Sequence, residues 1–254
     1  PSDFEEFKKR LQQETNLLKR WFKEEGFTDN GMIAGFELET WLVDQQFSPS
    51  PINKVFLESL NSPLVSPELS RFNIELNSTP HPLKNHFLDS LKEELIQTWK
   101  TCHECAHQFD SDLIMIGTLP TLNSKSLSLK NMSPLKRYKA LNDQIFRLKR
   151  GRPMKLDIQG KDHLKTTHKN VMLESAATSL QIHLQVNAKC ATRYYNAATI
   201  LSAPMVAIAA NSPYLFGKDL WDETRIPLFE QAVGIGSFRD KINRLVHRVT
   251  FGTN

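Results

Sequence analysis

The order of the expected helices and strands predicts an α+β fold. Helical and strand segments follow one another irregularly, which argues against the strict alternation of a doubly wound parallel sheet. Three expected strands alternate apolar with polar side chains, so each offers one apolar and one polar face. Glycine totals only 10 of 254 residues, and neither common glycine-rich phosphate loop is present. A nucleotide, if bound, must therefore be held by metal ions and side chains.

Composition narrows the functional classes. Hydrophobic residues make up 40% of the chain, which is adequate for a core, and 32 Lys and Arg against 28 Asp and Glu leave a formal charge of +4. This surplus is too small to indicate a nucleic-acid partner, although it suits small anions. The longest apolar stretch, 197–210, is shorter than the about 20 residues of a membrane span. The charged start, "PSDFEEFKKRLQQ", is unlike a signal peptide. We expect a cytoplasmic chain without a membrane partner.

The first half of the chain is expected to contain two helices and three strands. Residues 3–25 carry an apolar stripe at helical spacing that ends at Gly26, and residues 83–109 repeat this pattern. The apolar or β-branched run 32–43 and the alternating run 71–79 predict strands, each ended by a proline-bearing segment. The short apolar run 112–120 predicts a buried strand.

The second half begins with a polar loop at 121–135 and a helix at 135–151. The basic stretch "RLKRGRPMK" then reads as a solvated turn in preference to a phosphate contact. After a polar segment, 159–170, strict alternation predicts a strand at 179–187. Residues 194–211 are expected to form a buried helix, and residues 237–249 are amphipathic.

Three cysteines in a chain of this length do not indicate a disulfide framework. The segment "CHECAH", residues 102–107, could be a metal clip, but no second ligand pair at comparable spacing accompanies it. Cys102 also continues the apolar face of the helix at 83–109. We therefore favour a buried, structural Cys102, and an ordinary small residue at Cys190.

The polar faces of the three alternating strands carry groups of ligand type. Glu37 and Glu39 share a face, as do the sets Asn73, Glu75, Asn77 and Gln181, His183, Gln185. Two carboxylates on one strand face repel each other and require a cation, a proton or open water. If the strands are neighbours in one sheet, their polar faces form a floor suited to Mg²⁺, which prefers oxygen ligands. A solvated sheet edge remains the alternative, as does a structural role for His183.

Six segments in this order resemble the second type of glutamate–cysteine ligase family and its carboxylate–amine ligase relatives. They are "GFELETWLVD", "FNIELNSTPHPL", "LIMIGTLPTL", "RYKALND", "TSLQIHLQV" and "ANSPYLFGK...ETR", between about Gly31 and Arg225. The resemblance implies a curved, mainly antiparallel sheet with helices on its outer face, like glutamine synthetase and the guanidino kinases. It implies ATP and Mg²⁺ as cofactors. The implied reaction joins the γ-carboxylate of glutamate, or a similar carboxylate, to an amine such as cysteine through an acyl phosphate.

The resemblance also assigns roles by position. Glu37, Glu39, Glu75 and Glu68 fall on the family's metal ligands, although Glu68 could equally begin a helix. Gln181, His183 and Gln185 fall on metal or nucleotide contacts. Arg225 falls on an arginine that grips substrate carboxylate or phosphate, against the alternative of an ion pair with Asp222 or Glu223. Arg137 and Tyr138 match an element that faces the substrate.

Family members run well past 350 residues, so we expect residues 1–254 to be a single ligase-like catalytic domain that is incomplete at its C-terminus. Two other functions stay open. One is a non-catalytic nucleotide- or metabolite-binding domain of the same fold. The other is an enzyme that transfers a phosphoryl group to a guanidino group, but the segments "NSPYLFGK" and "FNIELNSTP" resemble the ligases better than such kinases. The expected partners are small molecules, and a homo-oligomer is left open.

Overall fold

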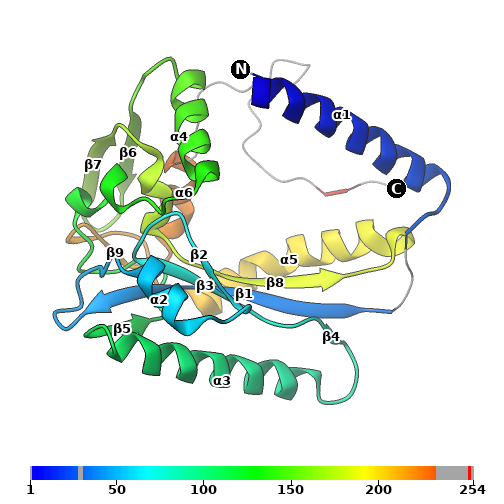
Figure 1. Cartoon of the computed structure of the whole chain (residues 1–254), viewed down its shortest axis with the longest axis horizontal. Helices are drawn as coiled ribbons and strands as arrows, with labels where there is room; N and C mark the ends of the chain where they lie inside the picture. Colours follow the sequence, from blue (N-terminus) through cyan, green and yellow to red (C-terminus); the bar gives the residue numbers. More distant parts are fainter. Residues whose placement is uncertain (1, 28–30, 233–250, 253–254) are drawn as a thin grey trace.

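A six-stranded antiparallel sheet organises the chain (Figure 1). The computed structural model describes residues 2–27, 31–232 and 251–252. Its central strand is the long β1, Ile33–Asp44. One side of β1 pairs with β3 (Asn73–Asn77) and β4 (His81–Pro82), and the other pairs with β5 (Ser111–Ile114) and β8 (Leu180–Gln185). Strand β2 (Val65–Pro67) pairs with β3. The predicted α+β fold is confirmed.

The remaining elements connect or flank this sheet. The helices are α1 (Ser2–Lys23), α2 (Asn53–Leu60), α3 (Phe87–His107), α4 (Lys136–Leu148), α5 (Ala191–Ala209) and α6 (Arg225–Ala232). Two hairpins stand outside it, β6 (Met154–Gln159) with β7 (His163–His168) and β9 (Tyr214–Leu215) with β10 (Lys218–Asp219). The 3₁₀ turns are η1 (Ser124–Ser126), η2 (Leu129–Asn131), η3 (Val171–Ala176) and η4 (Ala188–Cys190). None of the helices in the described part meets the length and apolarity needed to cross a bilayer.

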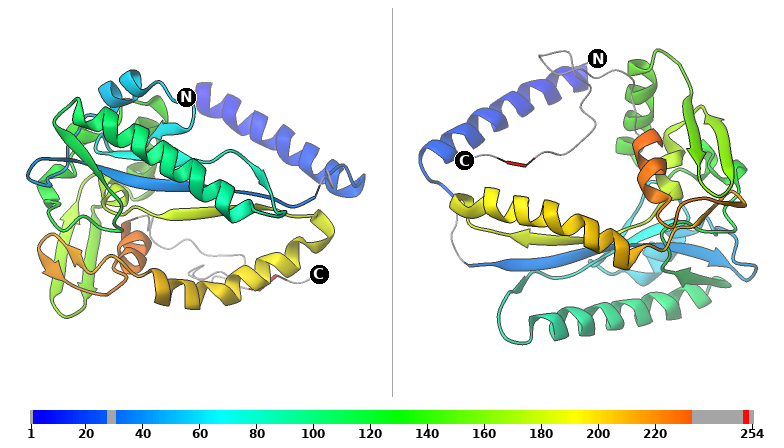
Figure 2. Two further views of the ribbon diagram at one scale, coloured as in Figure 1. Left: turned by 90° about the horizontal axis from the view of Figure 1, so that it is seen from below. Right: turned by 180° about the vertical axis from the view of Figure 1, so that it is seen from behind.

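Helix α3 covers the apolar face of the sheet (Figure 2). Alternation along β1 turns Phe36, Leu38 and Leu42 toward it, because successive strand side chains point to opposite faces. Cys102 and Cys105 of α3 are buried in the same hydrophobic cluster, with Phe56 of α2 beneath them. The predicted burial of Cys102 is confirmed, and these cysteines serve as small core residues.

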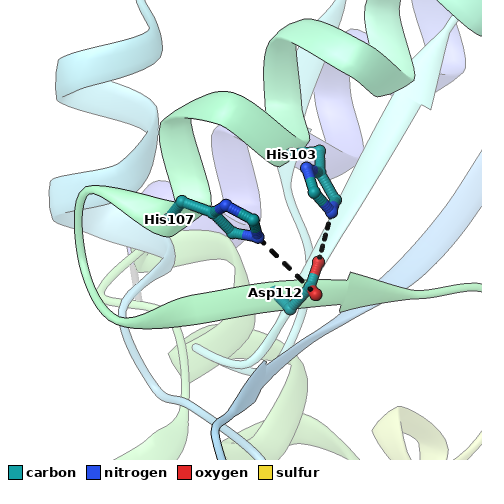
Figure 3. Close-up of side chains that lie close together, drawn as sticks. All are labelled: His103, His107 and Asp112. Carbon is teal, nitrogen blue, oxygen red and sulfur yellow. Dashed lines mark ion pairs between the residues drawn. The ribbon is translucent and has the colours of Figure 1, made fainter.

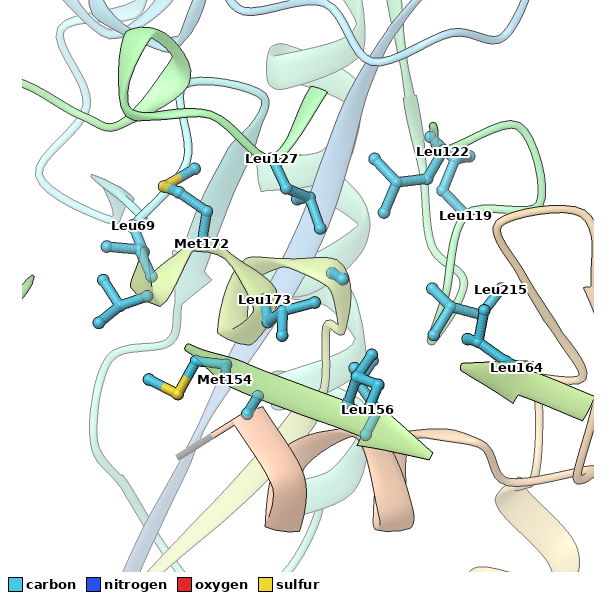
Figure 4. Close-up of a cluster of buried hydrophobic side chains, with 14 of the residues drawn as sticks. Leu69, Leu119, Leu122, Leu127, Met154, Leu156, Leu164, Met172, Leu173 and Leu215 are labelled. Atoms are coloured by element: carbon cyan, nitrogen blue, oxygen red, sulfur yellow. The ribbon is translucent and has the colours of Figure 1, made fainter. Parts of the chain in front are cut away.

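A second hydrophobic core lies on the opposite face, at the C-terminal half of β1 (Figure 4). Trp41 and Phe72 are fully buried and stack with ring centroids 5.7 Å apart. The hairpin β6–β7 and the turn η3 close this core with Met154, Leu156 and Leu173. It holds in place the chain segments that border the polar face of the sheet.

Two expectations about local structure were incomplete. The hairpin β6–β7 occupies a region expected to be a basic turn and a polar connection. Met154, Leu156 and Ile158 alternate with exposed neighbours there, but the surrounding charges obscured this two-residue period. The strand expected over 112–120 ends at Ile114, and α2 was not expected.

The helix expected to be buried over 194–211 is exposed, and so are two other apolar surfaces. The apolar residues of α5 lie open, with Ile208 79% exposed, and so does Ile182 on β8, at 65%. The apolar stripe of α1 is exposed as well, and α1 runs apart from the sheet in all three views (Figures 1 and 2). Within the described ranges no element covers these side chains. The amphipathic segment 237–249 lies outside them.

Candidate functional site

Strand register brings the three predicted polar faces side by side. Strand β1 lies between β3 and β8, with Glu39 opposite Glu75. Glu37 lies opposite Asn77 on one side and Gln181 on the other. The three strands are thus neighbours in one sheet, which is the condition set above for a shared polar floor. Directly opposed residues of antiparallel strands project to the same face.

Three glutamates form a carboxylate cluster on this floor. Glu39, Glu68 and Glu75 each place one carboxylate oxygen within 4.8 Å of the others. Glu39 comes from the middle of β1 and Glu75 from β3, while Glu68 follows directly after β2. The sequence separations of 29 and 7 residues are closed by the β2–β3–β1 pairing, so the cluster depends on an intact sheet.

Each carboxylate is oriented by hydrogen bonds from the chain. The Ser179 backbone N–H and Oγ donate to Glu39 Oε2 at 2.7 and 3.2 Å. Ser66 Oγ and Asn77 Nδ2 donate to Glu75 Oε1 at 3.0 and 3.1 Å. The Leu69 backbone N–H donates to Glu68 Oε2 at 3.1 Å. The second oxygens of Glu39 and Glu75 accept none of these bonds.

Burial and mutual repulsion oppose ionisation of the cluster. Burial raises the pKa of Glu68 to about 8, and the nearby Glu39 carboxylate adds to the shift. Burial also raises the pKa of Glu39, despite the hydrogen bonds from Ser179, and Glu75 contributes repulsion. Without a cation the cluster retains a proton near neutral pH. A divalent cation would replace that proton and offset the repulsion.

Glu39 and Glu68 of the carboxylate cluster line a cavity of about 570 Å³, within the range of small-molecule sites. Arg225 lines the same cavity; its Nη1 donates to the Thr178 carbonyl at 2.9 Å and its Nε is paired with Glu223. Arg225 thus lines the cavity, as its expected contact with substrate requires. It also forms the ion pair with Glu223 that the sequence left open as the alternative to substrate binding. Gln181 lines the same cavity.

Glu37 lies outside the carboxylate cluster. Its Oε2 is 3.2 Å from His183 Nε2, and both residues line a neighbouring hollow of about 380 Å³ together with Gln185. Glu37 and Glu39 thus line different hollows, because they are separated by one strand repeat of about 7 Å. Glu75 lines neither hollow.

Arg137 and Tyr138 lie beside the carboxylate cluster but line neither hollow. Tyr138 donates from its hydroxyl to the Pro67 carbonyl at 3.2 Å, directly before Glu68. The Arg137 guanidinium lies 4.7 Å from the Tyr138 ring centroid and donates to its hydroxyl at 2.9 Å. Burial raises the pKa of Tyr138, and Glu68 raises it further. Both residues thus support the wall that carries Glu68.

Comparison with known proteins identifies the chain's family. Residues 33–237 match the family model "Glutamate-cysteine ligase family 2 (GCS2)". The chain belongs to this family. The match spans all of the clustered residues named above, and the resemblance stated from the sequence motifs is confirmed.

The chain is also similar to a solved structure of glutamate–cysteine ligase from Francisella tularensis in complex with AMP. The sequence identity is 14% and the TM-score is 0.41. The similarity covers 72% of this chain and 32% of the other, so this member of the ligase family spans about a third of that protein's length. No curated protein matches the chain.

Two acidic residues of the main cavity were not predicted. Glu174 of η3 and Glu223 both line it, and burial raises the pKa of Glu174. Glu223 is mostly buried beside Arg225. Neither residue lies on an alternating strand, so periodicity could not reveal it. Only the quoted segment "ETR", in which Glu223 stands two residues before Arg225, offered a signal.

Proposed function

We propose that this chain carries the metal and substrate site of an ATP- and Mg²⁺-dependent carboxylate–amine ligase. The reaction would join the γ-carboxylate of glutamate, or a similar carboxylate, to an amine such as cysteine through an acyl phosphate. The single observation that carries the proposal is the convergence of Glu39, Glu68 and Glu75, two of which, Glu39 and Glu68, line a cavity together with Arg225. The GCS2 family match supports the reaction class.

The carboxylate cluster suits Mg²⁺. Mg²⁺ prefers oxygen ligands and commonly retains waters and phosphate oxygens, so three carboxylates on a rigid sheet are a suitable partial shell. Burial and repulsion from Glu39 raise the pKa of Glu68, and a bound cation would offset that repulsion. Bound there, Mg²⁺ would offset the charge on phosphate oxygens during phosphoryl transfer.

The other residues would position the substrates. Arg225 can hold a carboxylate or phosphate with its planar fork, provided that its pairing with Glu223 leaves an N–H group available. Glu37 and His183 extend the row of ligands into the second hollow, where Gln185 also lies, and Gln181 lines the first. These residues are our candidates for nucleotide or second-metal contacts. The chemistry asks for position and charge neutralisation, with no covalent nucleophile from the protein.

An ADP-release assay tests the proposal. The chain is incubated with Mg-ATP, glutamate and a panel of amines that includes cysteine. We expect ADP release only when both glutamate and an amine are present. Glu75→Gln should lower the rate about a hundredfold or more, because metal charge neutralisation supplies several kcal/mol of the barrier reduction. Glu58→Gln, an exposed glutamate on α2, is the matched control and should keep the wild-type rate.

Calorimetry of Mg-ATP binding separates the remaining outcomes. Binding without ADP release for any amino-acid pair would contradict catalysis and support a non-catalytic nucleotide-binding domain. The glutamates would form only a solvated cluster if Mg-ATP gave no binding heat with the wild type and the same result were obtained with Glu39→Gln and Glu75→Gln.

A further inference from the structure

Two histidines and an aspartate converge at the end of helix α3 (Figure 3). His103 and His107 are one helical turn apart on the same face of α3, and Asp112 lies on the adjoining strand β5. His103 Nε2 is 3.2 Å from Asp112 Oδ1, and His107 Nε2 is 3.7 Å from Oδ2. The three side chains are separate from the carboxylate cluster and from both hollows of the proposed ligase site.

The spacing of these groups fits a single metal ion. One ligand atom from each residue lies within 4.8 Å of the others. Ligand atoms about 2.1 Å from a tetrahedral Zn²⁺ lie about 3.4 Å apart, so the two nitrogen–oxygen distances need little adjustment. Two imidazoles with one carboxylate are a common three-ligand set for Zn²⁺ and leave a fourth position for water.

The local structure holds the ligands in place. The Leu113 backbone N–H donates to Asp112 Oδ1 at 2.7 Å, which orients the carboxylate. The two imidazole rings lie side by side with centroids 4.1 Å apart, so both face one carboxylate. The three side chains are between 39% and 55% exposed, which leaves the position open to an ion from solvent.

The neighbouring cysteines do not contribute ligands. Cys102 and Cys105 lie on the buried face of α3 within the hydrophobic core. The histidines of "CHECAH" thus find their partner in Asp112, and the cysteines do not take part.

We infer that His103, His107 and Asp112 bind one divalent transition-metal ion, with Zn²⁺ as the best match. The ion connects the C-terminal end of α3 to β5. Because β5 pairs with β1 at Trp41–Asp44, the site anchors α3 to the strand that also carries Glu39. One coordination position remains for water.

Zinc titration of the full chain tests this inference. The protein is stripped with EDTA, exchanged into saturating Mg²⁺ to occupy the carboxylate cluster, and titrated calorimetrically with Zn²⁺. We expect one Zn²⁺ per chain and a higher Tm on binding. His103→Ala, His107→Ala and Asp112→Asn should each weaken binding by at least about tenfold, since even outer-shell partners contribute about 10–100-fold.

Two controls make the result specific. His86→Ala removes the exposed histidine at the N-cap of the same helix, which pairs with the carboxylate of Asp89, and should leave Zn²⁺ affinity unchanged. Glu75→Gln should also leave it unchanged, which separates this site from the proposed ligase site. Unaltered Zn²⁺ affinity in the double variant His103→Ala with His107→Ala would overturn the inference, and so would a thiolate charge-transfer band on Co²⁺ substitution. The Tm of each metal-free variant confirms that it is folded.

Discussion

Glu39 and Glu75 lie directly opposite each other on the antiparallel strands β1 and β3. Facing like charges destabilise a sheet, yet here hydrogen bonds from Ser179, Ser66 and Asn77 orient both carboxylates toward the same polar face. Such a pair costs stability unless a cation or a proton lies between the two groups. The cost is consistent with a binding role, since functional sites commonly carry strain that the rest of the fold tolerates.

Glu75→Gln should therefore separate stability from binding. Removal of one facing carboxylate should raise the free energy of unfolding by about 0.2–1 kcal/mol in EDTA. The same change should weaken Mg²⁺ binding and cancel the stabilisation that Mg²⁺ confers on the wild type. Urea denaturation with EDTA and with Mg²⁺ measures both effects. If Glu75→Gln is less stable than the wild type in EDTA and gains as much stability from Mg²⁺ as the wild type does, then Glu75 is not a Mg²⁺ ligand.

Glu68 predicts a pH dependence of stability. Its pKa is raised from 4.5 to about 8 in the folded chain, so between these values the folded state binds a proton that the unfolded state has released. The contribution is fully present below pH about 4.5 and is lost as the pH rises through about 8. We expect the Tm in EDTA to fall less steeply for Glu68→Gln than for the wild type between pH about 5.5 and 8.5. Equal slopes would argue against a retained proton on Glu68.

Arg225→Lys tests the proposed recognition of a glutamate substrate. Lysine keeps the charge but cannot present the planar fork, and it loses the bond from Arg225 Nη1 to the Thr178 carbonyl. Charge-assisted hydrogen bonds contribute about 1.5–3 kcal/mol, so the KM for glutamate should rise about 10–100-fold. The KM for ATP provides the internal comparison. An unchanged KM for glutamate would assign Arg225 to its ion pair with Glu223 alone.

Gly117→Ala should displace Arg225 without removing any functional group. A Cβ at Gly117 would lie 2.6 Å from Asn211 Oδ1 and 2.8 Å from Arg225 Nε, so both side chains must move. We expect a stability loss of about 1–3 kcal/mol, typical of overpacking. The KM for glutamate should change in the same direction as in Arg225→Lys. If steady-state kinetics match the wild type while stability falls, the position of Arg225 is not critical.

Trp41→Phe tests the core beneath the site. Trp41 is fully buried, and its Nε1 donates to the Ile116 carbonyl at 2.9 Å. Phenylalanine keeps a ring against Phe72 but removes one of the two hydrogen bonds that the Ile116 carbonyl accepts, since Thr178 Oγ1 still donates to it at 2.6 Å. Loss of one such bond costs about 0.5–1.5 kcal/mol. Urea denaturation should show this loss with an unchanged m-value. A loss below about 0.5 kcal/mol would mean that the indole bond contributes little.

Local periodicity was sufficient to predict most of the individual elements. The period of two along 71–79 and 179–187 predicted which side chains share a face, because pleating alone dictates that alternation. The same argument placed Glu37 and Glu39 together on the polar face of β1. Periodicity did not reveal the hairpin β6–β7, because charged residues interrupt its apolar pattern. Nor did it predict that the apolar surfaces of α1, α5 and β8 would be exposed.

By itself, then, the sequence determined the α+β class, the two faces of each strand and the motifs of the GCS2 family. Only the tertiary structure decided which polar groups meet: Glu39 with Glu68 and Glu75, Glu37 with His183, and Asp112 with the two histidines of α3. The physical reason is that a strand's pattern depends on neighbouring residues, whereas register and the closure of turns depend on packing between segments distant in the chain.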